Sequence, residues 1–182
     1  MKIIGVVGMP GSGKGEFSRI ARSLAIPVIV MGDVIREEAL RLGLPGTDAN
    51  LGEIAGRLRK DRGMDAIAAL TLPAIEKEDA PLVVVDGIRG DAEVGFFREK
   101  FPGFLLIGID APFAARLSRL SSRGREDDGM TEDRLVLRDR REISWGLGRA
   151  LAAADDILCN DGTMEEFEEK VRALLAEIRE GP

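Results

Sequence analysis

The sequence predicts an α/β fold built on a five-stranded parallel sheet, and three observations support this prediction. Short apolar runs, rich in β-branched residues, recur along the 182-residue chain and are separated by segments with helical spacing. The central runs are apolar without alternation, as in strands that helices cover on both faces. A glycine-rich turn follows the first run directly. Strands that alternate with helices imply right-handed crossovers, with ligands bound at the carboxyl ends of the strands.

The predicted elements follow one another in a regular order. Strands are predicted at 2–7, 27–30, 81–86, 104–109 and 156–159. Helices are predicted at 15–24, 33–42, 51–60, 64–76, 91–100 and 131–145, with further helices starting near Pro112 and after Thr163. A proline suits a first helical turn, and Thr163 with Glu166 forms a capping box. The polar, glycine-containing segment 121–130 is predicted to be a mobile loop.

Composition is that of an ordinary globular protein and excludes several kinds of chemistry. The hydrophobic fraction of 45% fits one domain over residues 1–182, and without a membrane span or signal-peptide pattern we expect a cytoplasmic protein. A net charge of −6 argues against a protein that coats nucleic acid. Histidine is absent, so acid or base chemistry must use carboxylates. Cys159 lies in an apolar run and is interpreted as a core residue.

The glycine-rich turn has the pattern of a P-loop, which holds phosphate groups with backbone N–H groups. Its residues are Gly8, Met9, Pro10, Gly11, Ser12, Gly13 and Lys14. The glycines let the backbone approach phosphate oxygens, and the following helix adds its positive dipole end. The Lys14 ammonium is predicted to bridge the transferring phosphate and its neighbour. Gly15 and Glu16 stand where the general pattern has a hydroxyl for Mg²⁺, so the metal must be held otherwise.

Further polar residues are predicted to meet at the edge of the sheet where the P-loop lies. Asp33, Asp86, Arg89 and Asp110 follow predicted strands, and the carboxyl ends of parallel strands share one edge. Arginines are also concentrated between positions 116 and 149. Phosphoryl transfer spreads negative charge over several oxygens, which arginines and a metal ion stabilise. The sequence therefore predicts nucleotide chemistry at this edge.

The P-loop, continued by Gly15, resembles the adenylate kinase loop Gly-x-Pro-Gly-Ser-Gly-Lys-Gly. From there the chain resembles the nucleoside monophosphate kinase superfamily over nearly its whole length. Residues 31–36, Met-Gly-Asp-Val-Ile-Arg, are similar to Thr-Gly-Asp-Met-Leu-Arg of that family, which implies that Arg36 grips the acceptor's phosphate. Residues 86–89, Asp-Gly-Ile-Arg, resemble Asp-Gly-Phe-Pro-Arg shortened by one residue. This implies a second acceptor arginine at Arg89 and a carboxylate for the water shell of Mg²⁺ at Asp86.

The resemblance continues through the arginine-rich segment. The spacing from Pro112 to Arg119 to Arg123 is that of a family segment in which one arginine stacks on the ATP base and the next contacts its phosphates. Residues 125–128, Arg-Glu-Asp-Asp, resemble the lid sequence Arg-x-Asp-Asp, which implies a catalytic role for Arg125. Arg138 resembles the lid arginine one helix later.

Two details of this resemblance bear on the choice of residues and of family. The register around Arg138 differs by two residues, so Arg134 or Arg141 could take its place. Residues 155–162 resemble a stretch of dephospho-CoA kinases beside the ATP adenine, which implies nucleotide contact at Asn160. Overall, the chain is similar to a group of archaeal adenylate-kinase-like or dephospho-CoA-kinase-like proteins.

The resemblance implies a three-layer P-loop NTPase fold with a helical acceptor-binding insert at about 33–77 and an arginine-rich lid at about 121–131. We expect ATP- and Mg²⁺-dependent phosphoryl transfer to a nucleotide or nucleotide-like small molecule, by a monomer or small homo-oligomer. Arg36 and Arg89 favour a phosphate acceptor, whereas Asp33 suits proton acceptance from a hydroxyl, as in dephospho-CoA kinases. The alternatives are a slow ATPase that acts as an assembly or regulatory factor, favoured by Glu16, and GTP as donor, disfavoured because an Asn-Lys-x-Asp motif is absent.

Each of these residues also has a purely structural interpretation. The arginines from Arg119 onward could pair with nearby acidic residues on a solvated helix face. Asp86 could only hold its loop, and Arg36 could be a surface residue. Asp33 could simply cap the helix that follows it.

Overall fold

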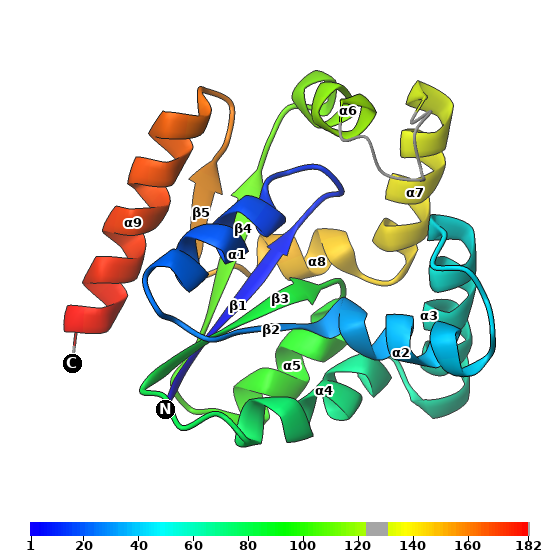
Figure 1. Cartoon of the computed structure of the whole chain (residues 1–182), viewed down its shortest axis with the longest axis horizontal. Coiled ribbons are helices and arrows are strands. Elements are labelled where there is room, and N and C mark those ends of the chain that lie inside the picture. The colour runs from blue at the N-terminus through cyan, green and yellow to red at the C-terminus, as the bar shows by residue number, and fades with distance from the viewer. Residues whose placement is uncertain (123–130, 182) are drawn as a thin grey trace.

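A computed structural model describes residues 1–122 and 131–181, which form helical layers on both sides of a central sheet (Figure 1). Within these residues the sheet has five parallel strands in the order β2-β3-β1-β4-β5. The strands are β1 Lys2–Gly8, β2 Val28–Val30, β3 Leu82–Ile88, β4 Phe104–Asp110 and β5 Asp156–Cys159. The predicted α/β class and the parallel sheet are thus confirmed.

The helices connect successive strands and cover both faces of the sheet. They are α1 Lys14–Ser23, α2 Met31–Arg41, α3 Asp48–Arg62, α4 Ala66–Glu76, α5 Asp91–Lys100, α6 Phe113–Ser121, α7 Glu132–Ser144, α8 Leu147–Ala152 and α9 Met164–Glu180. The capping box predicted for α9 is confirmed, because Thr163 Oγ1 accepts from the Glu166 amide while Glu166 accepts from the Thr163 amide. The short helix α8 was not predicted from the sequence; it begins after Gly146, whose φ is +98°.

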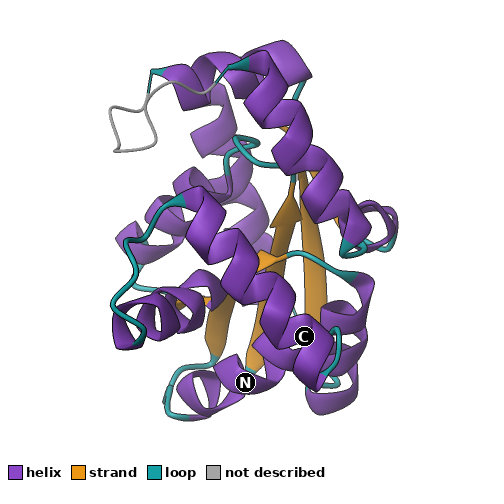
Figure 2. Cartoon of the chain, turned by 90° about the vertical axis from the view of Figure 1, so that its right-hand side faces the viewer, coloured by secondary structure: helices purple, strands orange, loops and turns teal. Residues whose placement is uncertain are grey.

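Two apolar clusters fix the layers. On one face α1 and α9 pack against the sheet through Phe17, Ile20 and Phe167, all at most 1% exposed. On the other face α4, α5 and α8 bury Ile75, Phe97 and other apolar side chains in a second cluster. Figure 2 shows helices on both sides of the strands. Burying both faces in this way accounts for the unbroken apolar runs in the sequence.

The structure corrects two predictions about the strands, one on where β3 ends and one on the burial of Cys159. Strand β3 was expected to end at Asp86, but it continues to Ile88 through an irregularity at Gly87, where φ is +103° and the register against β1 shifts by one residue. Cys159 is exposed rather than part of the core. Its strand, β5, lies at the edge of the sheet and leaves even Ile157 51% exposed.

The helices α2, α3 and α4 pack against one another beside the carboxyl ends of β2 and β3. They span the region predicted to be the acceptor-binding insert, and Figure 1 places α3 next to α7. Of the predicted lid, residues 123–130 lie outside those described. Among the described residues, none of the helices combines the length and apolar character that crossing a lipid bilayer requires.

Candidate active site

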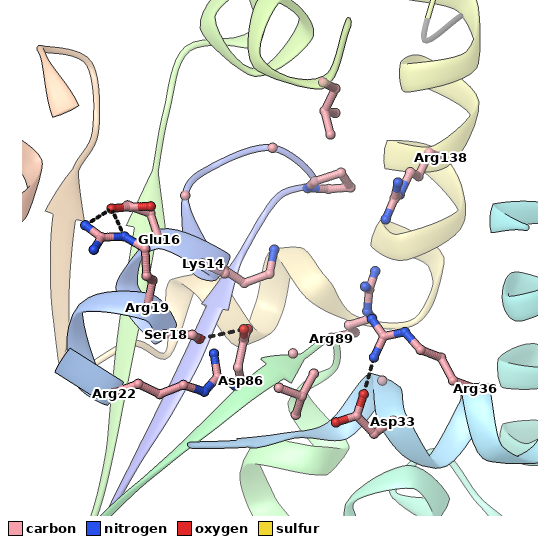
Figure 3. A pocket seen from close by; sticks show the side chains of 18 residues that line it. Lys14, Glu16, Ser18, Arg19, Arg22, Asp33, Arg36, Asp86, Arg89 and Arg138 are labelled. Carbon is pink, nitrogen blue, oxygen red and sulfur yellow. Dashed lines mark hydrogen bonds and ion pairs between the residues drawn. The ribbon is translucent and has the colours of Figure 1, made fainter. Parts of the chain in front are cut away.

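A cavity of about 670 Å³ lies at the carboxyl edge of the sheet. Figure 3 shows the side chains that line it. Its lining brings together residues that the sequence separates: Gly11, Gly13, Lys14, Glu16, Asp33, Arg36, Asp86, Arg89 and Arg138. The parallel sheet explains most of this convergence. The P-loop follows β1, α2 follows β2 and Arg89 follows β3, and these strands all end at the same edge of the sheet.

The P-loop has the backbone geometry that its glycines were predicted to allow. Gly11 has a φ of +78° and Gly13 a φ of +121°, both in the range that residues with a Cβ rarely adopt. A Cβ at Gly8 would lie 2.6 Å from the carbonyl oxygen of Ile109. Helix α1 begins at Lys14, so its unpaired N–H groups and positive dipole end face the loop.

Lys14 lies across the loop that precedes it. Its Nζ donates to the carbonyl oxygens of Gly8 and Met9 at 2.5 and 3.2 Å. Withdrawal from water, together with the positive charge of Arg89, lowers the pKa of Lys14 to about 8, against the opposing pull of Glu142 and Asp86. A phosphate group entering the loop would restore the charged form, because an anion stabilises an ammonium.

Asp86 meets a partner that sequence reasoning missed. Ser18 Oγ, on the second turn of α1, donates to Asp86 Oδ2 at 2.7 Å, and both residues are buried (Figure 3). Asp86 also lines the large cavity together with Lys14. Mg²⁺ in phosphate sites is held by one or two carboxylates, by phosphate oxygens and by water, so this donor set fits the ion. The described residues form no cluster of three or more potential metal ligands.

Arg119 on α6 and Asn160, which directly follows the edge strand β5, connect these elements to the P-loop. Arg119 Nη2 donates to the backbone and side-chain oxygens of Asn160, each at 3.0 Å. Asn160 Nδ2 in turn donates to the Ser12 carbonyl oxygen at 2.8 Å. Arg119 therefore does not belong to a solvated face of paired charges. Arg123 and Arg125, predicted for catalysis, lie outside the described residues.

A buried arginine that the sequence analysis did not select supports the same loop. Arg116 is 5% exposed and forms a bidentate pair with Asp139 of α7, with N–O distances of 3.1 and 2.8 Å. Its Nη1 also donates to the Pro10 carbonyl oxygen at 3.0 Å. Arg116 therefore ties α6 to α7 and to the P-loop.

A second, smaller pocket of about 120 Å³ adjoins the first. Apolar residues from three helices and Trp145 form part of its wall: Ile35, Leu51, Ala55 and Ile67. Its arginines are Arg36, Arg59, Arg89, Arg138 and Arg141. The guanidinium carbon of Arg59 lies 4.4 Å from the centre of the Trp145 ring, and that of Arg141 lies 5.7 Å from it. This pocket combines an apolar wall with many cationic groups.

Asp33 and Arg36 stand on one exposed turn of α2. They form an ion pair, and both line the large cavity (Figure 3). The helix begins at Met31, with Val30 as its N-cap, so Asp33 does not cap it. That structural alternative for Asp33 is excluded.

Glu142 is the functional candidate that sequence reasoning missed most clearly. Its carboxylate pairs with Arg89 and accepts from Arg138 Nε at 3.2 Å, while its side chain is 1% exposed. Burial alone would raise the pKa of Glu142, but the charges of Arg89, Arg138 and Lys14 hold it below its usual value. The i,i+4 spacing from Arg138 was a signal that could have found it.

Comparisons with known proteins identify the family. The sequence profile of a family described as an AAA domain matches residues 7–134, more than half of the chain. A UPF0200 protein from Methanoculleus marisnigri is 60% identical over 178 residues, covering 98% of this chain and 97% of that protein. A UPF0200 protein from Methanoregula boonei is 57% identical over 182 residues, covering 100% of both.

Solved structures show the fold class. TT1252 from Thermus thermophilus superposes with a TM-score of 0.66 at 22% identity, covering 97% of each chain. Shikimate kinase from Aquifex aeolicus gives a TM-score of 0.56 at 18% identity, covering 99% of each chain. Fold and P-loop together define a P-loop NTPase with a kinase-like fold. The chain belongs to the UPF0200 family of archaeal proteins.

Proposed function

We propose that this protein is a kinase that transfers the γ-phosphate of ATP, with Mg²⁺, to a phosphate group on a nucleotide or nucleotide-like small molecule. One observation carries the proposal: Arg89 and Arg138 line both the cavity at the P-loop and the smaller pocket. A phosphate transferred between donor and acceptor must pass the point where the two sites meet. Arginines at that point stabilise the charge of the transition state.

The donor side follows from the P-loop. Its backbone N–H groups and the first turn of α1 bind the ATP phosphates, and Lys14 leaves its two carbonyl partners to contact them. Asp86, held by Ser18, would hold Mg²⁺ through its waters. The ion supplies charge neutralisation at the phosphates when it is bound. We assign Arg119 to the base of the nucleotide, whereas Asn160, which is 3% exposed, supports Arg119 and the P-loop from behind.

The acceptor side is proposed from the smaller pocket. Arg36, Arg89 and Arg138 face it, which suits a phosphate that needs electrostatic alignment more than a base. Its volume of about 120 Å³ lies below the roughly 300–1,000 Å³ of typical small-molecule sites. We therefore expect α2 and α3 to move apart from α7 when a whole nucleotide enters.

Hydroxyl phosphorylation is the second candidate, and one observation favours it. The side chain of Asp33 is 60% exposed and lines the large cavity, within reach of solvent and of an incoming alcohol. A carboxylate in that position would accept the proton of a hydroxyl nucleophile. The slow ATPase that acts on a macromolecular partner is a third hypothesis, which the same assays address.

The acceptor assignment is tested with Arg36→Ala. We expect the KM for the acceptor to rise at least about tenfold while the KM for ATP stays within about twofold, because one charge-assisted contact to phosphate is lost. Arg41→Ala is the matched control, since Arg41 lies on the same helix and pairs with Glu38 at 2.7 Å outside both cavities. An unchanged acceptor KM in Arg36→Ala would remove Arg36 from the acceptor site.

The chemical class of the acceptor is tested with Asp33→Asn in the same assay. A phosphate acceptor leaves kcat within about threefold of the wild type, because no proton has to be removed. A loss on the order of 10²-fold or more would instead establish Asp33 as a base and the acceptor as a hydroxyl compound.

A further inference from the structure

The wall shared by the two pockets depends on one buried acid. Arg89 follows the end of β3 and Arg138 lies on α7, so the two side chains come from different elements to the same side of the site, across from Lys14 (Figure 3). Both bind the same carboxylate, Glu142, which lies one turn after Arg138. Two guanidinium groups so placed repel each other unless an anion lies between them.

Glu142 is not placed to contact a substrate itself. Its side chain is 1% exposed, and neither cavity is lined by it. Its Oε2 is buried and has no hydrogen-bond partner among the described residues. Its contacts therefore serve the two arginines, which do line the cavities.

The same network reaches the acceptor side of the molecule. Asp48, the first residue of α3, pairs with Arg138 Nε at 3.3 Å and with Arg141 Nη2 at 2.9 Å. Arg138 is thereby held between an acid on α3 and an acid on its own helix. One end of this chain of ion pairs belongs to the helix that borders the smaller pocket, and the other end is Arg89.

We infer that Glu142 is a positioning residue, which holds Arg89 and Arg138 on the shared wall so that both guanidinium groups face the transferring phosphate. This inference rests on the proposed kinase function. Glu142 fixes the positions of the two guanidinium groups, and the guanidinium groups themselves contact the phosphate. In the transition state the guanidinium N–H groups that do not bind Glu142 contact the transferring phosphate. The N–H groups that bind Glu142 stay bound to it.

The test compares Glu142→Asp with Glu142→Gln in the full chain. Aspartate keeps the charge but withdraws the carboxylate by one methylene group, whereas glutamine keeps the shape and removes the charge. Both variants lower kcat, by on the order of 10²-fold for a displacement of about 1 Å. Glu132→Gln, on the exposed first turn of the same helix, leaves kcat unchanged.

Each other outcome overturns the inference. Glu142→Asp with wild-type kcat beside an impaired Glu142→Gln would mean that the charge matters and its position does not. A variant more active than the wild type would mean that Glu142 competes with the acceptor's phosphate. Thermal unfolding of both variants is followed in parallel. If Glu142→Gln does not fold, Glu142→Asp decides alone.

A binding measurement separates this inference from the proposed function. Inorganic pyrophosphate is titrated into the wild type and Glu142→Asp by calorimetry. Displaced arginines weaken binding about tenfold or more, whether or not the protein is a kinase, because each misplaced charge-assisted contact is lost. Equal affinities would overturn the positioning role. A wild type that binds pyrophosphate but phosphorylates no acceptor would overturn the kinase proposal alone.

Discussion

ATP binding should weaken as pH rises through the titration of Lys14. In the free protein the pKa of this lysine is lowered to about 8, first by its withdrawal from water and then by the charge of Arg89. A lysine usually loses its proton near pH 10.4. The lowered pKa means that the neutral amine appears about two pH units earlier than usual, and binding a phosphate then requires uptake of a proton.

The size of the effect follows from that pKa. With a value of about 8, about 90% of the Lys14 amines carry a proton at pH 7 and about 10% do at pH 9. If only the ammonium binds phosphate, affinity falls about tenfold over this interval, or about 1.4 kcal/mol. The phosphate groups contribute little to the change, since their second pKa of about 6 leaves them ionised throughout.

Calorimetric titration of a non-hydrolysable ATP analogue, with Mg²⁺, between pH 7 and pH 9 measures this linkage. Repeating the titration in buffers of different ionisation enthalpy counts the proton taken up. Lys14→Arg is the control, because arginine stays charged throughout this range and its affinity should not depend on pH. A wild-type affinity that changes by less than twofold between pH 7 and pH 9 would refute the reasoning. An equal loss of affinity in Lys14→Arg would refute it as well.

Three further predictions concern the loop, the metal and the core. Gly13→Ala weakens ATP binding about tenfold or more, because φ is +121° and the new Cβ would lie 2.3 Å from Asn160 Nδ2; calorimetry measures it. Ser18→Ala raises the Mg²⁺ concentration for half-maximal activity about 10–100-fold, because Asp86 loses its 2.7 Å partner. Glu93→Gln lowers the free energy of unfolding in urea by about 3–5 kcal/mol, because the ion pair with Arg59 is buried.

Controls for these variants come from neighbouring positions. Gly15→Ala leaves the loop intact, because a Cβ at this position would meet no atom of a neighbouring element within 4 Å. Ser23→Ala is made on the same helix as Ser18 but at an exposed site, and should leave the Mg²⁺ requirement unchanged. ATP affinity equal to that of the wild type in Gly13→Ala, or an unchanged Mg²⁺ requirement in Ser18→Ala, would contradict the assigned site. Glu93→Gln with wild-type stability would mean that the buried pair contributes nothing.

The sequence sufficed for those parts of the molecule that local chemistry determines. Glycines at positions 11 and 13 have the backbone angles for which glycine is needed, and the apolar runs became strands because helices bury both their faces. The convergence of Asp86 and Arg89 with Lys14 followed from the parallel order of the strands. Each of these inferences needed only a short segment and its place in the chain.

Other features depend on packing that short segments do not encode. An apolar run such as 157–159 does not reveal that its strand lies at a sheet edge, which is why Cys159 is exposed. Ser18 and Glu142 look like ordinary helix residues until the fold brings Asp86 and Arg89 to them. Asp86 lies 68 positions from Ser18, and Arg89 lies 53 positions from Glu142, so the sequence shows only the local pairing of Glu142 with Arg138.

The central claim is that phosphate moves from ATP to a small acceptor at the wall between the two pockets. Its most direct test is to incubate the protein with γ-labelled ATP and Mg²⁺ and a panel of nucleoside monophosphates, dephospho-CoA, shikimate-like alcohols or no acceptor. We predict that one acceptor is rapidly labelled on its phosphate group. We also predict that this labelling is abolished in Lys14→Ala protein that still folds. Slow release of phosphate with every acceptor left unlabelled, or labelling retained in Lys14→Ala, would contradict the account.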